Sequence, residues 1–111
     1  MIIIDGSFAV TRQGYELTRF YLADERILRV RVYRDAYQSQ SWATAQVLTP
    51  VLTWTDLTDA PASRWHPATP LTAADEAPLA PVADILADNA TALLVAHRTG
   101  QARPQPRRRT D

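Results

Sequence analysis

The chain has 111 residues, a formal net charge of zero and no cysteine. That length fits one domain with a core of its own, and the lack of cysteine excludes disulfides, thiolate metal ligands and a cysteine nucleophile. The balanced charge argues against a protein that binds polyanions over its whole surface. The first residues contain neither a basic leader nor an apolar stretch of about 20 residues, so we expect a cytoplasmic protein without a membrane span.

Turn signals and strand-forming residues alternate at the start of the chain. Asp5-Gly6 lies between the apolar triplets 2–4 and 8–10, which predicts a hairpin with a two-residue turn. Residues 15–22 are rich in aromatic and β-branched side chains and predict the next strand. Residues 23–26 predict the turn that follows it.

The clearest alternation of the sequence lies in residues 27–34. It places Leu28, Val30 and Val32 on one face of a strand, and Arg29, Arg31 and Tyr33 on the other. We expect Phe20 to pair with Val30, which turns Phe20 toward the core.

A further strand is expected within residues 40–49. Ala43 is expected opposite Val32, and Ala45 opposite Val30, so that small side chains in the middle of the sheet leave room for a helix. After Pro50, residues 51–57 predict an edge strand.

The second half of the chain predicts an irregular connection followed by one helix. Residues 58–72 are rich in Pro, Ala and Thr, and we expect order there where Trp65 is buried. Pro81 suits the first turn of a helix that ends near Arg98 with Gly100 as its stop. The expected buried stripe of this helix consists of Val82, Ile85, Leu86, Asn89, Leu93 and Ala96.

These elements predict an α+β fold, with an antiparallel β-meander of four to six strands packed on one face by the C-terminal amphipathic helix. Residues 1–100 are expected to form the single domain. Residues 101–111, which include three successive arginines and two prolines, are expected to be a disordered Arg/Pro-rich tail.

The sequence lacks the common catalytic and cofactor-binding motifs. The two histidines have no partner at metal-ligand spacing, and the three glycines form no phosphate-binding loop. We therefore expect no metal, no cofactor and no catalytic set of residues, and an enzyme is the less favoured class.

The strongest candidate for a functional surface is the sheet face opposite the helix. The expected pairing gathers eight residues there: Arg19, Tyr21, Arg29, Arg31, Tyr33, Trp42, Thr44 and Gln46. Arginine and aromatic residues dominate protein hot spots, and the same mixture binds single-stranded nucleic acid. An ordinary solvated face, with arginine stems lying over aromatic rings, is the plain alternative.

Residues 30–43, followed by Trp54-Thr55-Asp56-Leu57, resemble small uncharacterised proteins of actinobacteria and their phages. Those proteins carry a basic strand, an Asp-Ser-Tyr turn, a Gln-Ser-x-Ala strand and a tryptophan strand; this chain has Ala36 where serine is expected. The resemblance transfers no function. It implies a structured turn made by four residues: Asp35, Tyr37, Gln40 and Ser41.

Three functional hypotheses follow. The leading one is a non-enzymatic binding or assembly module from an actinobacterial or phage-related locus. Its arginine and aromatic face is expected to meet a protein partner or a second copy in a homo-oligomer. The second is a nucleic-acid-binding accessory protein that uses Arg29, Arg31 and the basic tail. The third is a small enzyme with a site near Asp35, Tyr37 and His66.

Overall fold

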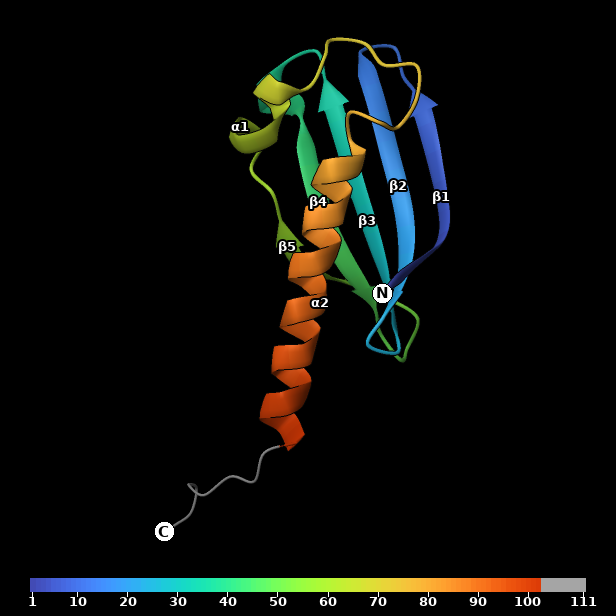
Figure 1. Cartoon of the computed structure of the whole chain (residues 1–111), viewed down its shortest axis with the longest axis vertical. Coiled ribbons are helices and arrows are strands. Elements are labelled where there is room, and N and C mark those ends of the chain that lie inside the picture. Colours follow the sequence, from blue (N-terminus) through green and yellow to red (C-terminus); the bar gives the residue numbers. More distant parts are fainter. Residues whose placement is uncertain (103–111) are drawn as a thin grey trace.

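The computed structural model describes the backbone of residues 1–102 and the side chains of residues 1–98. Within this part of the chain, five strands form one antiparallel sheet in the order β1-β2-β3-β4-β5, and α2 crosses one face of it (Figure 1). The strands are β1 (Ile2–Val10), β2 (Gly14–Ala23), β3 (Arg26–Asp35), β4 (Trp42–Leu48) and β5 (Trp54–Asp59). The predicted α+β meander with a C-terminal helix is confirmed.

β1 is one continuous strand, so the predicted hairpin at Asp5-Gly6 is wrong. Asp5 pairs with Phe20 and Gly6 with Arg19, after a register shift between Ile3 and Asp5. Gly6 does not have the positive φ that a type I′ turn requires. Pairing along the whole of β2 forms more ladder hydrogen bonds than a hairpin with three-residue arms would, so the longer strand is favoured.

The turn between β2 and β3 has only two central residues. Asp24 and Glu25 have φ values of 51° and 63°, and Ala23 pairs with Arg26. These are the features of a type I′ turn. Phe20 consequently pairs with Arg29 and not with Val30, and this slip of one residue moves every side chain of β2 to the face opposite the predicted one.

The pairing of β3 with β4 agrees with the sequence. Val32 pairs with Ala43, and Val30 pairs with Ala45, so both predicted pairs are confirmed. β5 begins at Trp54, three residues later than predicted, because residues 49–53 close a tight turn in which the Thr49 N–H donates to the Thr53 carbonyl at 2.8 Å.

α2 (Ala80–Ala102) packs on the sheet through small side chains. Pro81 lies in its first turn, as predicted, whereas Gly100 lies within the helix and does not end it. The helix is rotated relative to the predicted stripe, with Ile85, Asn89, Leu93 and Ala96 exposed. The residues it buries are Leu79, Val82, Ala83, Leu86, Ala87, Ala90 and Leu94. Buried alanines on both the helix and the sheet let the two layers pack closely. The predicted stripe was chosen mainly from larger apolar residues and therefore missed the buried alanines of the helix.

The connection from β5 to α2 covers the helix side of the sheet. It contains a short helix, α1 (Ala62–Trp65), and a 3₁₀ turn, η2 (His66–Ala68), where an irregular path was expected. Trp65 is buried in the same core as α2, and its Nε1 donates to the Ala60 carbonyl at 3.1 Å. Another 3₁₀ turn, η1 (Gln38–Gln40), joins β3 to β4. Of the predicted tail, residues 101–102 end α2 and the others lie outside the described residues.

The turn between β2 and β3 offers a direct test of its geometry. Glu25 has a side chain in the left-handed region, which costs about 1 kcal/mol relative to glycine. Glu25→Gly is therefore expected to raise the free energy of unfolding by about 0.5–1 kcal/mol in urea titrations. Gln13→Gly, in the β1–β2 turn where φ is not positive, is the control and should not stabilise. Equal effects of both variants would contradict the assigned turn.

Candidate functional site

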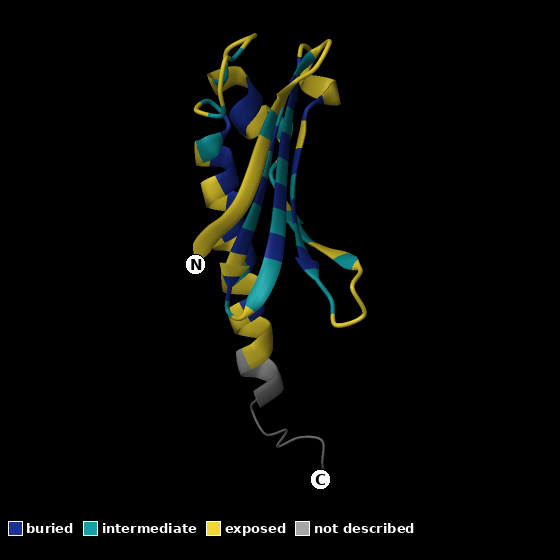
Figure 2. Ribbon diagram, turned by 90° about the vertical axis from the view of Figure 1, so that its right-hand side faces the viewer, coloured by how far each residue is buried: buried dark blue, intermediate teal, exposed yellow. Residues whose placement is uncertain are grey.

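The sheet face turned away from α2 is uncovered, and we call it the open face. Figure 2 shows α2 on one side of the sheet only. Residues directly opposite in antiparallel strands share a face, so the register assigns these residues to the open face: Ile2, Asp5, Ser7, Ala9, Glu16, Thr18, Phe20, Leu22, Ile27, Arg29, Arg31, Tyr33, Asp35, Trp42, Thr44, Gln46, Leu48, Trp54, Asp56 and Asp59.

Two aromatic rings from non-neighbouring strands meet over the open face. Phe20 on β2 and Trp54 on β5 have ring centroids 6.0 Å apart, although two strands lie between β2 and β5. Flat strands at the usual spacing would hold those backbones about 14 Å apart. The two side chains therefore lean toward one another over β3 and β4. Sequence reasoning missed both residues, because the register error turned Phe20 inward and Trp54 comes from the edge strand.

Arg29 is held beneath Trp54 by internal contacts. Its guanidinium carbon lies 4.4 Å from the centre of the Trp54 ring. Its Nε and Nη2 donate to Gln46 Oε1 at 2.9 and 2.6 Å, and Gln46 Nε2 donates to Asp56 Oδ1 at 2.8 Å. Burial, and then the neighbouring charge of Arg31, lower the pKa of Arg29. The donors of Arg29 are thus used within the sheet.

Arg31 differs from Arg29 because part of its hydrogen-bonding capacity is unused. Its guanidinium lies 5.5 Å from the centre of the Trp42 ring, and that ring lies 5.9 Å from the ring of Tyr33. The Nε of Arg31 is buried and has no hydrogen-bond partner. Among the described residues, no carboxylate oxygen forms a salt bridge with Arg31. Its cation is therefore available to a group from outside the chain.

The end of β3 forms a tightly hydrogen-bonded turn. The Tyr33 hydroxyl donates to Asp35 Oδ1 at 2.5 Å, and the Tyr37 N–H donates to Asp35 Oδ2 at 3.0 Å. The Asp35 N–H donates to Ser41 Oγ at 2.9 Å. The hydrogen bond from Tyr33, then that from the Tyr37 backbone, lower the pKa of Asp35, and the same bond to Asp35 raises the pKa of Tyr33. Of the four expected turn residues, Asp35 and Ser41 form hydrogen bonds through their side chains and Tyr37 through its backbone, whereas the Gln40 side chain forms none there.

His66 and Arg34 lie behind this turn and contact its main chain. His66 Nε2 is 3.0 Å from the Asp35 carbonyl oxygen, and Arg34 Nη1 donates to the same oxygen at 3.1 Å. Arg34 also donates to Thr69. Tyr37 is 71% exposed and points its ring into solvent. The structure brings Asp35, Tyr37 and His66 together through backbone atoms, and Asp35 already has two donors on its carboxylate.

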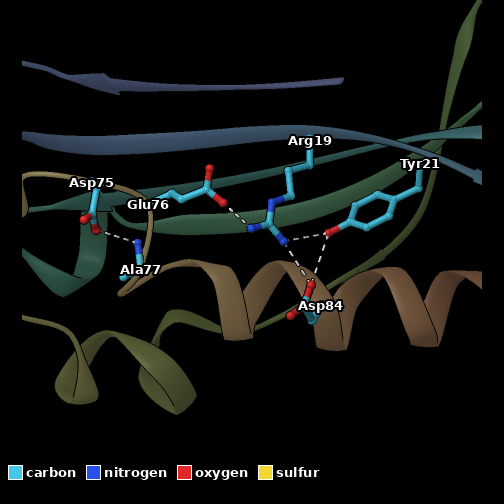
Figure 3. A network of polar contacts seen from close by, with 6 residues as sticks. All are labelled: Arg19, Tyr21, Asp75, Glu76, Ala77 and Asp84. Carbon is cyan, nitrogen blue, oxygen red and sulfur yellow. Dashed lines mark hydrogen bonds and ion pairs between the residues drawn. The ribbon is translucent and has the colours of Figure 1, made fainter. Parts of the chain in front are cut away.

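Arg19 and Tyr21, both expected on the open face, lie on the opposite face under α2. Figure 3 shows the Arg19 guanidinium between Glu76, from the loop before α2, and Asp84 on α2. Arg19 Nη1 donates to Asp84 Oδ1 at 3.0 Å and to the Tyr21 hydroxyl at 3.4 Å, and Arg19 Nη2 pairs with Glu76. Burial opposes the charge of Arg19, but the hydrogen bonds with Tyr21 and Glu76 leave its pKa above its ordinary value. Burial also raises the pKa of Tyr21.

The corrected register changes the charge of the open face. Without Arg19 the face carries two arginines, Arg29 and Arg31, against five acidic residues. Those acidic residues are Asp5, Glu16, Asp35, Asp56 and Asp59. Such a balance does not attract a phosphate backbone, whose binding depends on a surplus of cations.

Other classes of site find little support within residues 1–102. No group of three or more His, Asp or Glu side chains is placed to hold a metal ion in that range. None of the helices described there is long and apolar enough to cross a membrane. Comparisons with protein-family models, curated proteins and solved structures give no significant match. The resemblance of residues 30–57 to actinobacterial and phage proteins therefore stays a prediction.

The interior network predicts how substitutions of Arg19 affect stability. Arg19→Met keeps much of the buried volume and releases two carboxylates that are half exposed, at 46% for Glu76 and 61% for Asp84. We expect the free energy of unfolding to fall by about 1–2 kcal/mol for Arg19→Met, and by about 2–4 kcal/mol for Arg19→Ala, which also leaves a cavity. Chemical denaturation measures both, with exposed Arg64→Met as a control that changes little. A neutral Arg19→Ala would contradict the network.

The turn at Asp35 predicts a dependence of stability on pH. Because the pKa of Asp35 is lowered in the folded state, its ionised form stabilises the fold above the unfolded value of about 3.9. That contribution is lost as the pH falls through this value toward the folded pKa. Asp35→Asn should therefore be less stable than wild type at pH 7, with the difference shrinking below about pH 4. Urea titrations at both pH values check this, and a constant difference would argue against a role for the charge.

Proposed function

We propose that this chain is a non-enzymatic protein-binding module and that the centre of its open face, at Arg31 and Trp42, contacts the partner. The observation that carries the proposal is the cationic side chain of Arg31, which forms no salt bridge within the described residues and lies beside an aromatic ring on an uncovered sheet face. A carboxylate or carbonyl oxygen of the partner would supply the charge-assisted hydrogen bond that the fold does not.

The residue types around Arg31 support the same function. Trp, Tyr and Arg are the residues most enriched in protein hot spots, and Trp42, Tyr33 and Arg31 are adjacent here. Trp42 is 37% exposed, so its ring is accessible. The partner that this chemistry fits is a protein surface with an apolar contact for Trp42 and a carboxylate or carbonyl oxygen for Arg31.

The alternatives have weaker support. Nucleic-acid binding would need more than two arginines on a face with five carboxylates. An enzyme based on Asp35, Tyr37 and His66 would need those groups to be free, but Asp35 and His66 already bond to neighbouring atoms of the fold. Their contacts explain the turn without a chemical role.

Site-specific crosslinking tests the proposed surface. A photo-crosslinking amino acid at Thr44, which pairs with Arg31, should capture a defined protein in cells of the native host. Arg31→Glu or Trp42→Ala in the same chain should reduce that product at least about tenfold, the equivalent of about 1.4 kcal/mol. Arg64→Glu, an exposed arginine on the connection at the other side of the sheet, is the matched control. A product that both arginine variants reduce equally, or no product, would overturn the proposal.

A further inference from the structure

β1 is an edge strand with apolar side chains on both of its faces. It pairs only with β2, and no described element lies beyond it. Figure 2 shows it exposed along almost its whole length from the N-terminus. It contains no proline, lysine or arginine, the residues that commonly prevent an edge strand from pairing with another chain. The exposed apolar side chains at this edge are Met1, Ile2, Ile3, Ile4 and Val10, with exposed fractions from 48% to 68%.

The backbone of β1 presents a regular set of N–H and C=O groups that point away from β2. The Thr11 N–H donates to the Gly14 carbonyl at 2.8 Å, so Thr11 bonds toward β2. The backbone hydrogen bonds of an antiparallel strand alternate between its two sides. The N–H and C=O groups of Ala9, Ser7 and Asp5 therefore also bond toward β2, whereas the N–H and C=O groups of Gly6, Phe8 and Val10 point away from it. The Gly6 N–H agrees with this assignment, since it donates to Asp5 Oδ1 at 2.8 Å and not to β2.

We propose that β1 pairs antiparallel with β1 of a second copy, about a two-fold axis at Phe8. The outward residues 6, 8 and 10 are symmetric about Phe8, so Gly6 of each copy meets Val10 of the other and all three positions gain partners. The two sheets then become continuous. Phe8, already packed at 6.0 Å on Tyr15, meets its symmetry mate at the centre.

The charges at the two ends of β1 favour a second copy as the occupant. Asp5 lies near one end of the strand and exposed Arg12 just past the other. Pairing centred on Phe8 places Asp5 opposite Thr11 of the second copy and close to the next residue along that chain, Arg12, which lies in the turn after the strand. The two Asp5 residues are then about 20 Å apart along the strands, so they do not repel one another strongly.

A hollow at the far end of β1 gives a place for the isoleucines of the second copy. It has a volume of about 230 Å³, and its lining includes Val10, Thr11, Gln13 and Leu71. In the proposed register, residues 2–4 of the second copy run past Thr11 toward this hollow. Leu71 is itself 65% exposed. The pairing therefore covers apolar surface at both ends of the strand, which the single chain leaves in water.

A charge-reversal cycle in the full chain tests both the interface and its register. Analytical ultracentrifugation should show a concentration-dependent dimer of the wild type. Asp5→Arg and Arg12→Asp should each weaken dimerisation by about tenfold, and the double variant should restore it to within about threefold of wild type. Circular dichroism verifies that each variant is folded. A monomeric wild type at about 100 μM, or a double variant as weak as the single ones, would overturn the proposal.

A second pair of variants tests the outward backbone groups. Val10→Pro removes an N–H that faces away from β2, so it should abolish the dimer while leaving the sheet folded. Val10→Ala keeps that N–H and should retain the dimer.

The interface uses the edge of the sheet and leaves the open face of both copies free, so it stands apart from the proposed function. Trp42→Ala should leave the dimer unchanged. A dimer that is lost in Trp42→Ala but kept in Val10→Pro would place self-association on the open face and overturn the pairing of β1.

Discussion

The two-residue turn at Asp24-Glu25 determines which face each side chain of β2 occupies. Positive φ at both positions closes the hairpin with Ala23 opposite Arg26, and all pairs from there to Gly14 and Asp35 follow in fixed register. Because side chains alternate with a period of two, this turn alone decides that Arg19 enters the interior and that Phe20 leaves it. The polar network under α2 and the aromatic contact over β3 both depend on it.

Placing Arg19 in the interior has a structural consequence for the helix. A buried guanidinium must be paired, and its partners here come from two separate segments, Glu76 before α2 and Asp84 within it. The first turns of α2 are thereby attached to β2, while alanines pack the helix closely over β3 and β4. Near its other end, Arg98 pairs with Asp24 at 2.9 Å, so the helix also contacts the turn that sets the register.

The fold class could be predicted from the sequence, but the faces of its elements could not. The alternation of Leu28, Val30 and Val32 is compatible with only one orientation of β3. The small Ala43 and Ala45 correctly predicted which side of the sheet faces the helix. Residues 23–26 contain neither glycine nor asparagine, so nothing marked a two-residue turn there. Asp5-Gly6 carried the stronger local signal, and pairing along the whole of β2 overrode it. The Phe20–Trp54 contact joins β2 and β5 across two intervening strands, so no local sequence pattern encodes it.

The same geometry explains why this small fold exposes so much apolar and aromatic surface. One helix covers only one face of a five-stranded sheet, and the main contacts of α2 are with β2 to β5. A two-layer domain of this size would normally place polar residues on the remaining surfaces. Here the open face carries stacked rings around Arg31, and the edge carries three successive isoleucines. Both features are costly for an isolated chain, and they are the surfaces that association with other chains would remove from water.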